Sequence, residues 1–209
     1  MYLPKSFEQK DLASLHELMS QYSFATLVTT SATDGLVASH LPLLLDATRG
    51  TYGTLVGHLA RANHQWRDFE NAGETLVIFQ GPHTYISPSW YETVPSVPTW
   101  NYAVIHAYGQ PRLLEGYAPM HGLLQSLVQT HEAQFAHPWP LDLPSDYMHT
   151  MMAAIVGFEI EITRLEGKFK LSQNRTLPDQ QLVTAALEQL DEPLASHVAA
   201  MMQAAQNKS

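Results

Sequence analysis

The sequence predicts a mainly β, α+β domain in which an antiparallel barrel is flanked by helices. Strand-like segments follow one another along the chain and are joined by short turns, one of which contains the frequent hairpin sequence Asp34-Gly35. Helical patterns do not alternate one by one with these strands, as a doubly wound parallel sheet would require. The 209 residues, of which 45% are hydrophobic, are enough for one buried core, so we expect a single domain over residues 1–209.

The N-terminal part of the chain combines one helix with several strands. Leu12, Leu15, Leu18, Met19 and Tyr22 recur at helical spacing and predict an amphipathic helix that packs on the core. Runs rich in Val, Thr and Leu predict the strands that follow. These strands cover Phe24–Thr30, Leu36–Leu45 and Thr51–Leu59, and a polar, helix-compatible segment then covers Ala60–Ala72.

Further strands and a proline-rich loop occupy the middle of the chain. The expected strands cover Thr75–Gln80, His83–Ser87 and Thr99–Tyr108. The prolines of the intervening segment exclude helical geometry and predict a loop. They are Pro82, Pro88, Pro95 and Pro98.

The C-terminal part contains helices and the clearest half-buried strand. Helical spacing predicts helices over Tyr117–Phe135, near Tyr147–Ala154, and over about 178–206 with a break near Pro193. Phe158, Ile160 and Ile162 alternate with polar residues, which is typical of a strand with one buried face. We expect Lys168–Ser172 to pair with that strand.

Composition and missing motifs exclude several classes of protein. The net charge of −9 argues against a surface built for nucleic acid or anionic lipid, and the helix at Tyr117–Phe135 has no Lys or Arg with which to read DNA. The signatures of serine hydrolases, Rossmann dehydrogenases and P-loop enzymes are absent. Met1–Lys10 lacks the pattern of a signal peptide, and no apolar stretch approaches the length that spans a bilayer, so we expect a cytoplasmic protein.

Metal and thiol chemistry are not expected. The chain has no cysteine, which excludes disulfides, thiolate ligands and a cysteine nucleophile. None of its eleven histidines lies in a metal-binding motif on one helix face. His131 and His137 are interpreted as an exposed pair near a helix end.

An aromatic and amide-rich middle section predicts a binding site for a planar cofactor. Three of the four tryptophans lie there, and aromatic rings stack on flat ligands while amides meet ring heteroatoms. An aromatic barrel core would have the same composition, so both interpretations stay open. At Gly57–Asn63 a strand ends and a helix begins, so main-chain NH groups and Arg61 would be able to receive a phosphate. The alternative for Arg61 is an ordinary solvated residue.

Six longer segments carry a resemblance to a known family. They are ATLVTT from Ala25, ASHLPLLLD from Ala38, GHLARAN from Gly57, FQGPHTYISPSWY from Phe79, VPTWNY from Val97 and GFEIEITRLEGKFKLSQNR from Gly157. In order and spacing they resemble the PaiB-like family of FMN-binding negative transcriptional regulators, over Met1–Arg175. The chain departs from the family pattern between Tyr91 and Val97, where the loop is shorter, and again after Arg175.

The resemblance implies an FMN-binding split barrel of the flavin-reductase and pyridoxamine-oxidase type. It also implies a homodimer that holds FMN at its two-fold interface, with some contacts from the second subunit. Ser39 and His40 point to opposite faces of a strand, so both contact one ligand only through a main-chain group or across the dimer. The residues implied in FMN binding are Ser39, His40, Leu41, His58, Leu59, Ala60, Arg61, Asn63, Trp100, Asn101, Lys170 and Gln173.

Three functions are compatible with this reasoning. The family name implies a flavin-dependent regulator or sensor, for which we do not expect strong direct DNA binding. The alternative is an FMN-dependent oxidoreductase of the flavin-reductase or oxidase type, in which the cofactor carries the hydride. The third is haem binding, with an axial ligand from one histidine of a set of four. These four are His40, His58, His83 and His106.

Overall fold

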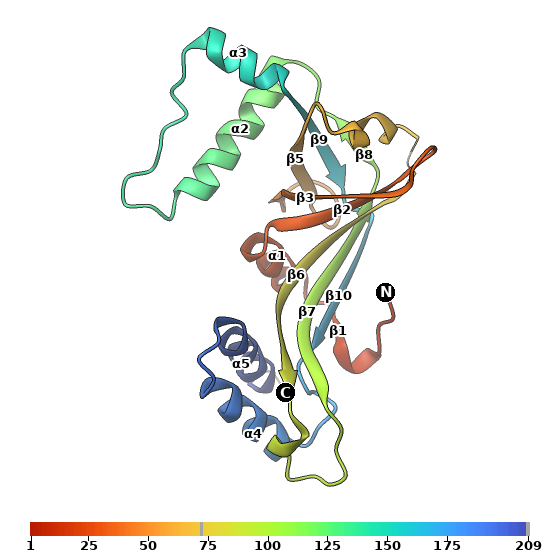
Figure 1. Ribbon diagram of the computed structural model, residues 1–209, viewed down its shortest axis with the longest axis vertical. Coiled ribbons are helices and arrows are strands. Elements are labelled where there is room, and N and C mark those ends of the chain that lie inside the picture. The colour runs from red at the N-terminus through yellow and green to blue at the C-terminus, as the bar shows by residue number, and fades with distance from the viewer. Residues whose placement is uncertain (72, 208–209) are drawn as a thin grey trace. The chain divides into compact units, whose positions relative to one another are not determined.

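The computed structural model describes residues 1–71 and 73–207, which contain two antiparallel sheets and five α-helices (Figure 1). Ala72, where the predicted helical segment Ala60–Ala72 ends, lies outside the described residues, as do Lys208 and Ser209. The α+β class with antiparallel pairing agrees with the sequence prediction. Closure into a complete barrel is not seen, because the strands form two separate sheets in the described residues.

The strand order shows how the two sheets are built. One sheet has the order β1 (Glu8–Gln9), β10 (Arg164–Lys170), β7 (Thr99–Gly109), β6 (Thr75–Ile86), β2 (Phe24–Ser31) and β3 (Gly35–Pro42). The other has the order β4 (Leu44–Asp46), β5 (Thr54–Ala60), β9 (Ile155–Glu161) and β8 (Pro111–Leu113). The pairs β2–β3, β2–β6, β4–β5, β5–β9 and β8–β9 are all antiparallel.

The helices lie mostly between or after the strands in sequence. They are α1 (Leu12–Gln21), α2 (Tyr117–Glu132), α3 (Ser145–Ala153), α4 (Leu177–Glu188) and α5 (Pro193–Gln206). Three short 3₁₀ turns are η1 (Lys5–Phe7), η2 (His64–Asp68) and η3 (Pro88–Trp90). The α-helices agree with the predicted ones to within a few residues.

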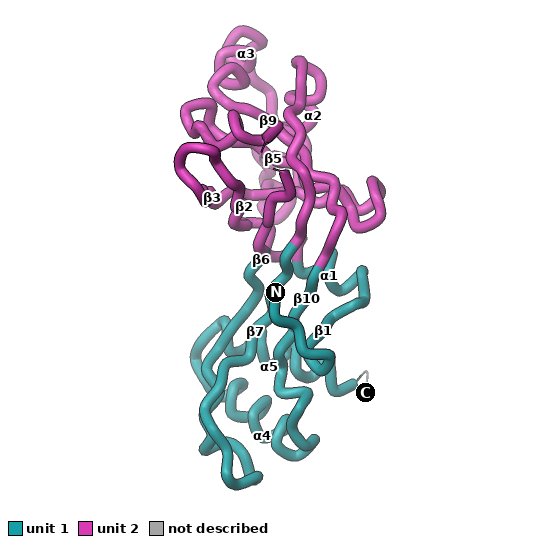
Figure 2. The backbone as a smooth tube through the Cα atoms, turned by 90° about the vertical axis from the view of Figure 1, so that its right-hand side faces the viewer, with its two compact units in different colours: residues 1–18, 79–106, 166–209 teal, residues 19–78, 107–165 magenta. Residues whose placement is uncertain are grey.

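The chain divides into two compact units (Figure 2). Unit 1 contains residues 1–18, 79–106 and 166–209, and unit 2 contains residues 19–78 and 107–165. Strands β6, β7 and β10 each have residues in both units. The single-domain assignment therefore stays a prediction.

Two predicted elements near the N-terminus differ from the structure. The run Leu36–Leu45 is not one strand, because its backbone leaves the sheet at Leu43, whose NH donates to the carbonyl of Ser23 at 2.9 Å. The preceding Pro42 has no NH to continue the ladder. The segment Ala60–Ala72 forms only the 3₁₀ turn η2 in its described part, which is consistent with its polar composition and lack of helical periodicity.

Two later predictions also need correction. Residues 168–172 do not pair with the strand at Phe158–Ile162, because β10 lies beside β1 and β7 in the other sheet. The segments Thr75–Gln80 and His83–Ser87 form one strand, β6, in which Gly81 and Pro82 are both buried. At this point the alternation of buried and exposed residues shifts by one position, which explains why the sequence read as two strands.

In unit 2, the core forms where the four-stranded sheet meets the β2–β3 hairpin and helix α2. Leu27 and Leu55 are fully buried, and Phe69 contacts Phe158 edge to face with ring centroids 5.1 Å apart. Helix α2 approaches β9 closely at Gly157, where a Cβ atom would collide with the sulfur of Met120. Glycine at this position therefore sets the distance between helix and sheet.

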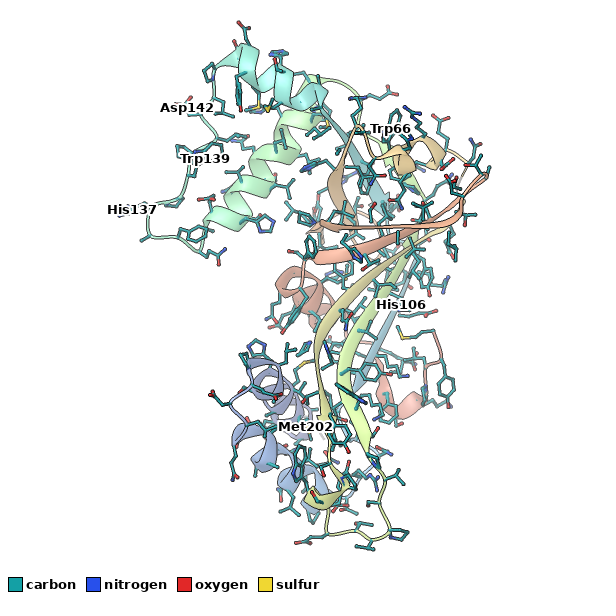
Figure 3. All side chains as sticks on the ribbon, in the orientation of Figure 1. Trp66, His106, His137, Trp139, Asp142 and Met202 are labelled. Atoms are coloured by element: carbon teal, nitrogen blue, oxygen red, sulfur yellow. The ribbon has the colours of Figure 1, made fainter. Side chains whose placement is uncertain are left out.

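In unit 1, helix α5 covers one face of β7. Asn101 is fully buried there and its Nδ2 donates to Ser172 Oγ at 2.9 Å and to Met202 Sδ at 3.4 Å. Figure 3 shows Met202 on the side of α5 that faces these strands. The amide of Asn101 is therefore used to join β7 to the segment after β10 and to the last helix.

The loop between β6 and β7 is fixed to helix α4. Asp179, in the first turn of α4, accepts hydrogen bonds from the NH groups of Glu92 at 2.9 Å and Thr93 at 3.2 Å. Arg175 lies over the ring of Tyr91 with its guanidinium carbon 4.4 Å from the ring centroid. Hydrogen bonding by Thr93 is the main cause that lowers the pKa of Asp179, so this carboxylate is ionised at neutral pH.

We predict that Asp179→Ala lowers the urea midpoint of unfolding, because two loop NH groups and the first turn of α4 lose a charged acceptor. Equilibrium urea unfolding followed by tryptophan fluorescence measures this. The control is Asp191→Ala, which removes an exposed carboxylate from the link between α4 and α5. Equal midpoints for the two variants would contradict the role given to Asp179.

Candidate functional site

The turn after β5 connects two of the predicted site residues directly. Ser39, on β3, accepts a hydrogen bond at 2.8 Å from Nδ2 of Asn63. Asn63 precedes η2 and caps it, because its Oδ1 accepts the NH of Gln65 at 3.1 Å. The side chains of Ser39 and Asn63, far apart in sequence, thus form one polar cluster beside η2.

A buried glutamine holds this cluster in place, and the sequence reasoning did not find it. Gln65 is 3% exposed, and its Nε2 lies 3.0 Å from Thr29 Oγ1, 3.2 Å from the carbonyl of Val37 and 3.3 Å from that of Leu27. One amide therefore joins η2 to both strands of the β2–β3 hairpin. Its Oε1 is also buried and has no partner among the described residues.

Arg61 is fixed by protein carbonyl groups. Its Nε donates to the carbonyl of Ala153 at 2.6 Å and its Nη2 to that of Ile155 at 2.8 Å, while its main-chain carbonyl accepts from Trp66 Nε1 at 3.1 Å. The side chain remains exposed on the surface. The guanidinium of Arg61 is thus a cation with a fixed orientation at the end of β5. In this it differs from a freely solvated arginine, which was the alternative interpretation.

The main-chain NH groups at this strand end are less available than the sequence suggested. The NH of Arg61 donates to the carbonyl of Ala154 at 2.8 Å, and that of Asn63 to the carbonyl of Ala60 at 2.9 Å. The expected group of free NH donors is therefore incomplete, because the turn from Ala60 to Asn63 and a contact with Ala154, the C-cap of α3, use two of them. The guanidinium of Arg61 still supplies a positive charge here.

The remaining predicted residues of β3 lie on opposite faces of the strand. Leu41 is 4% exposed and belongs to the core, whereas His40 is on the outer face, where its Nδ1 lies 2.9 Å from Thr26 Oγ1. Ser39 is on the inner face with Leu41, because it lies opposite buried Leu27 in the β2–β3 pairing. Only His40 presents its ring to the outer surface of this strand.

On β5 the predicted residues also separate by face. Leu59 is 4% exposed and packs in the core, while Ala60 is exposed at the strand end. His58 is half-buried, and its Nδ1 is buried without a partner among the described residues. Burial lowers the pKa of His58, so its imidazole is neutral at pH 7.

In unit 1, an aromatic group surrounds the predicted residue Trp100. Its indole is 52% exposed, with the ring of Tyr85 6.1 Å away and edge-on and that of His83 6.3 Å away. His83 and Tyr85 are two residues apart on β6, so their side chains share one face. The sequence singled out His83 only as a candidate haem ligand, and it did not point to Tyr85.

Lys170 lies next to Trp100 and is held by its neighbours. Its Nζ donates to Thr99 Oγ1 at 2.7 Å and to the carbonyl of Trp100 at 2.6 Å. Burial is the main cause that lowers the pKa of Lys170, and the nearby positive charges of Lys168 and Arg175 act in the same direction. The aromatic group and an amine therefore occupy the same part of unit 1.

Asn101 and Gln173 differ from the other predicted residues because the protein already uses their amides. The Nε2 of Gln173 donates to the carbonyl of Phe169, and its Oε1 accepts the NH of Leu171 at 2.6 Å. These bonds stabilise the turn at Ser172, which has a positive φ of 66°. In this structure both amides support the backbone around Trp100 and Lys170, and that of Asn101 is closed to solvent.

Two further findings concern other types of site. Within residues 1–71 and 73–207, no three His, Asp or Glu side chains are grouped so that they could hold a metal ion. In the same part of the chain, no helix combines the length and apolarity needed to cross a bilayer.

The paired antiparallel sheets with flanking helices define a fold of the split-barrel type found in flavin-binding proteins. Two solved structures share it. The FAD and heme binding protein from Mycobacterium smegmatis has a TM-score of 0.59 and 14% identity, over 78% of this chain and 73% of that one. The flavocytochrome Anf3 from Azotobacter vinelandii has a TM-score of 0.58 and 10% identity, over 81% of this chain and 70% of that one. At such low identities the likeness concerns the fold alone.

The chain belongs to the family described as "Putative FMN-binding domain", whose model matches residues 1–164. It is 36% identical over 204 residues to the Protease synthase and sporulation protein PAI 2 of Bacillus subtilis, covering 97% of each chain. The family resemblance seen in the sequence motifs is thereby confirmed.

The burial of His58 predicts a pH dependence. Because its pKa is lower in the folded than in the unfolded chain, protonation favours unfolding, and the resulting loss of stability begins as the pH falls below the unfolded value of about 6.5. Urea unfolding at pH 7 and pH 5 should therefore show a smaller pH effect in His58→Gln than in the parent chain. The control is His64→Gln, which replaces an exposed histidine. A pH effect in His58→Gln as large as in the parent chain would contradict the role given to His58.

Proposed function

We propose that this protein binds FMN and acts as a flavin-dependent regulator or sensor. The observation that carries the proposal is membership of an FMN-binding family over most of the chain. The chemistry of the candidate residues fits the cofactor: a half-exposed indole offers a stacking surface for a planar ring, and an oriented guanidinium offers a partner for a phosphate. FMN would supply redox chemistry, and the protein would supply binding and orientation.

The proposed contacts fall into two groups by unit. In unit 2, Arg61 would bind the phosphate, while Ser39 and Asn63 would offer hydroxyl and amide groups to it or to the ring. The other proposed contacts in this unit are His40, Leu41, His58, Leu59 and Ala60, where the buried leucines would contribute through main-chain groups.

In unit 1, Trp100 would stack on the flavin ring, with Lys170 beside it. Asn101 and Gln173 would act as positioning residues, because their amides fix the strand and turn that carry Trp100 and Lys170. Tyr85 and His83, whose rings lie against Trp100, would limit its rotation and so favour one stacking surface.

We predict that addition of the protein quenches FMN fluorescence along a saturable curve. We also predict that Arg61→Ala weakens the binding of FMN more than the binding of riboflavin. Only FMN carries the phosphate charge, so the loss of a charge-assisted contact should separate the two ligands by about tenfold or more. Fluorescence titration of both flavins measures the ratio. Arg67→Ala, which removes another exposed arginine near Trp66, is the matched control.

Two results would contradict this proposal. The absence of FMN quenching at high protein concentration would remove FMN as the ligand. Equal losses of FMN and riboflavin affinity in Arg61→Ala would remove Arg61 from the phosphate contact. A titration with haem in place of the flavins tests the haem-binding hypothesis.

We further propose a homodimer in which one flavin is contacted by both subunits. Strand β3 is at the edge of its sheet, and Leu36, 78% exposed, and His40 lie on its outer face, so a second copy would cover this strand. Light scattering of the purified protein should give the mass of two chains. A mass of one chain, 23.3 kDa, at working concentration would contradict the dimer.

The second candidate is an FMN-dependent oxidoreductase, which the exposure of Trp100 favours, since a flavin stacked on a surface side chain would stay open to another reactant. NADH or NADPH consumption by the FMN-loaded protein, above that of free FMN, separates the two functions. For the regulator, direct DNA binding is not part of the proposal, because a dimer of chains that each carry −9 repels a polyanion. Regulation would operate through a partner interaction.

A further inference from the structure

A cleft lies in unit 2, between helix α2 and the four-stranded sheet. Its volume is about 750 Å³, within the range of sites that bind small molecules. Leu43, Val56 and Leu114 form its apolar floor. None of the residues proposed to bind flavin lines this cleft.

The wall that α2 contributes contains a glycine without a packing reason. Gly122 lies in the interior of α2, where glycine is less favourable than alanine because it has more backbone freedom to lose. A Cβ atom at this position would meet nothing within 4 Å, so close packing does not require the glycine. Its effect is to leave space in the cleft that it lines. This differs from Gly157, where the closely packed Met120 excludes a side chain.

Hydroxyl groups line two sides of the same cleft. Ser126 and Thr130 follow Gly122 at intervals of four residues, so all three lie on one face of α2. Ser20 and Ser23 line another part of the wall. An occupant would therefore have an apolar body that lies on the leucines and valine, together with polar groups that can reach hydroxyls.

The charged residues that line the cleft determine which kind of polar group is favoured. Arg49 Nη2 is 2.7 Å from Glu159 Oε2, and Asp46 lines the same region. Hydrogen bonding by Thr48 is the main cause that lowers the pKa of Asp46, so this carboxylate is ionised at neutral pH. Two negative charges against one positive charge favour a cationic ligand over an anionic one.

We propose that this cleft is a binding site for a small amphipathic amine, with its apolar body on the floor at Leu43 and its ammonium group near Asp46 and Glu159. The site is separate from the proposed flavin contacts, so a ligand here would be an effector or a second substrate. The inference does not depend on FMN binding.

Three probes with one apolar body and different end groups test the proposal: 4-phenylbutylamine, 4-phenylbutanol and 4-phenylbutanoate. Amide shifts in ¹H–¹⁵N spectra of the full chain should saturate with the amine and include those of Gly122 and Ser126. The alcohol should bind about tenfold more weakly and the carboxylate more weakly still. No saturable binding of the amine, or tighter binding of the carboxylate, would overturn the proposal.

Matched variants locate the site. Gly122→Trp should abolish amine binding by filling the cleft, whereas Gly122→Ala adds only a methyl group and should retain it. Ser126→Leu gives a second way to fill the cleft if Gly122→Trp does not fold, as judged by circular dichroism. Glu159→Gln should reduce the preference for the amine over the alcohol. Wild-type amine affinity in folded Gly122→Trp or Ser126→Leu, or an unchanged preference in Glu159→Gln, would overturn the proposal.

Discussion

The buried amide of Gln65 is the interaction on which the arrangement of unit 2 at the candidate site depends. It reaches oxygens on both strands of the β2–β3 hairpin and so fixes η2 against them. Because η2 follows β5 directly, this contact also fixes Asn63 against Ser39. Removing a buried donor of this kind leaves its acceptors unsatisfied, at a cost of about 1–3 kcal/mol. The polar cluster thus exists before any ligand arrives, which lowers the ordering cost of binding.

Much of the fold could be predicted from the sequence because local patterns determine it. The alternation at Phe158, Ile160 and Ile162, the turn at Asp34-Gly35 and the spacing of Leu15 and Leu18 each specify an element by themselves. Which strands share a sheet is a non-local property, and the pairing expected for residues 168–172 was wrong for that reason. Likewise, a polar segment such as Ala60–Ala72 has too little apolar periodicity to show that only one 3₁₀ turn would form.

The candidate site was predicted mainly from family resemblance, and the structure separates its residues by what their side chains already contact. Asn101 and Gln173 have the amide groups expected of ligand contacts, yet these groups bind the protein itself. Residue type does not distinguish the two uses, because an amide is equally suited to both. Gln65 was missed for the same reason. Its place two residues after Asn63 identifies only the main-chain NH that the cap binds, which any residue type would supply.

We propose that the end of β5, fixed by the contacts of Gln65 and Arg61, receives the phosphate of FMN. The most direct measurement is a ¹H–¹⁵N spectrum of the apo-protein titrated first with FMN and then, in a separate sample, with riboflavin. We expect saturable FMN-induced shifts at Arg61 and Asn63 that riboflavin does not reproduce, because riboflavin lacks the phosphate. Unchanged amides at these two positions under saturating FMN, or the same shifts with both flavins, would contradict it.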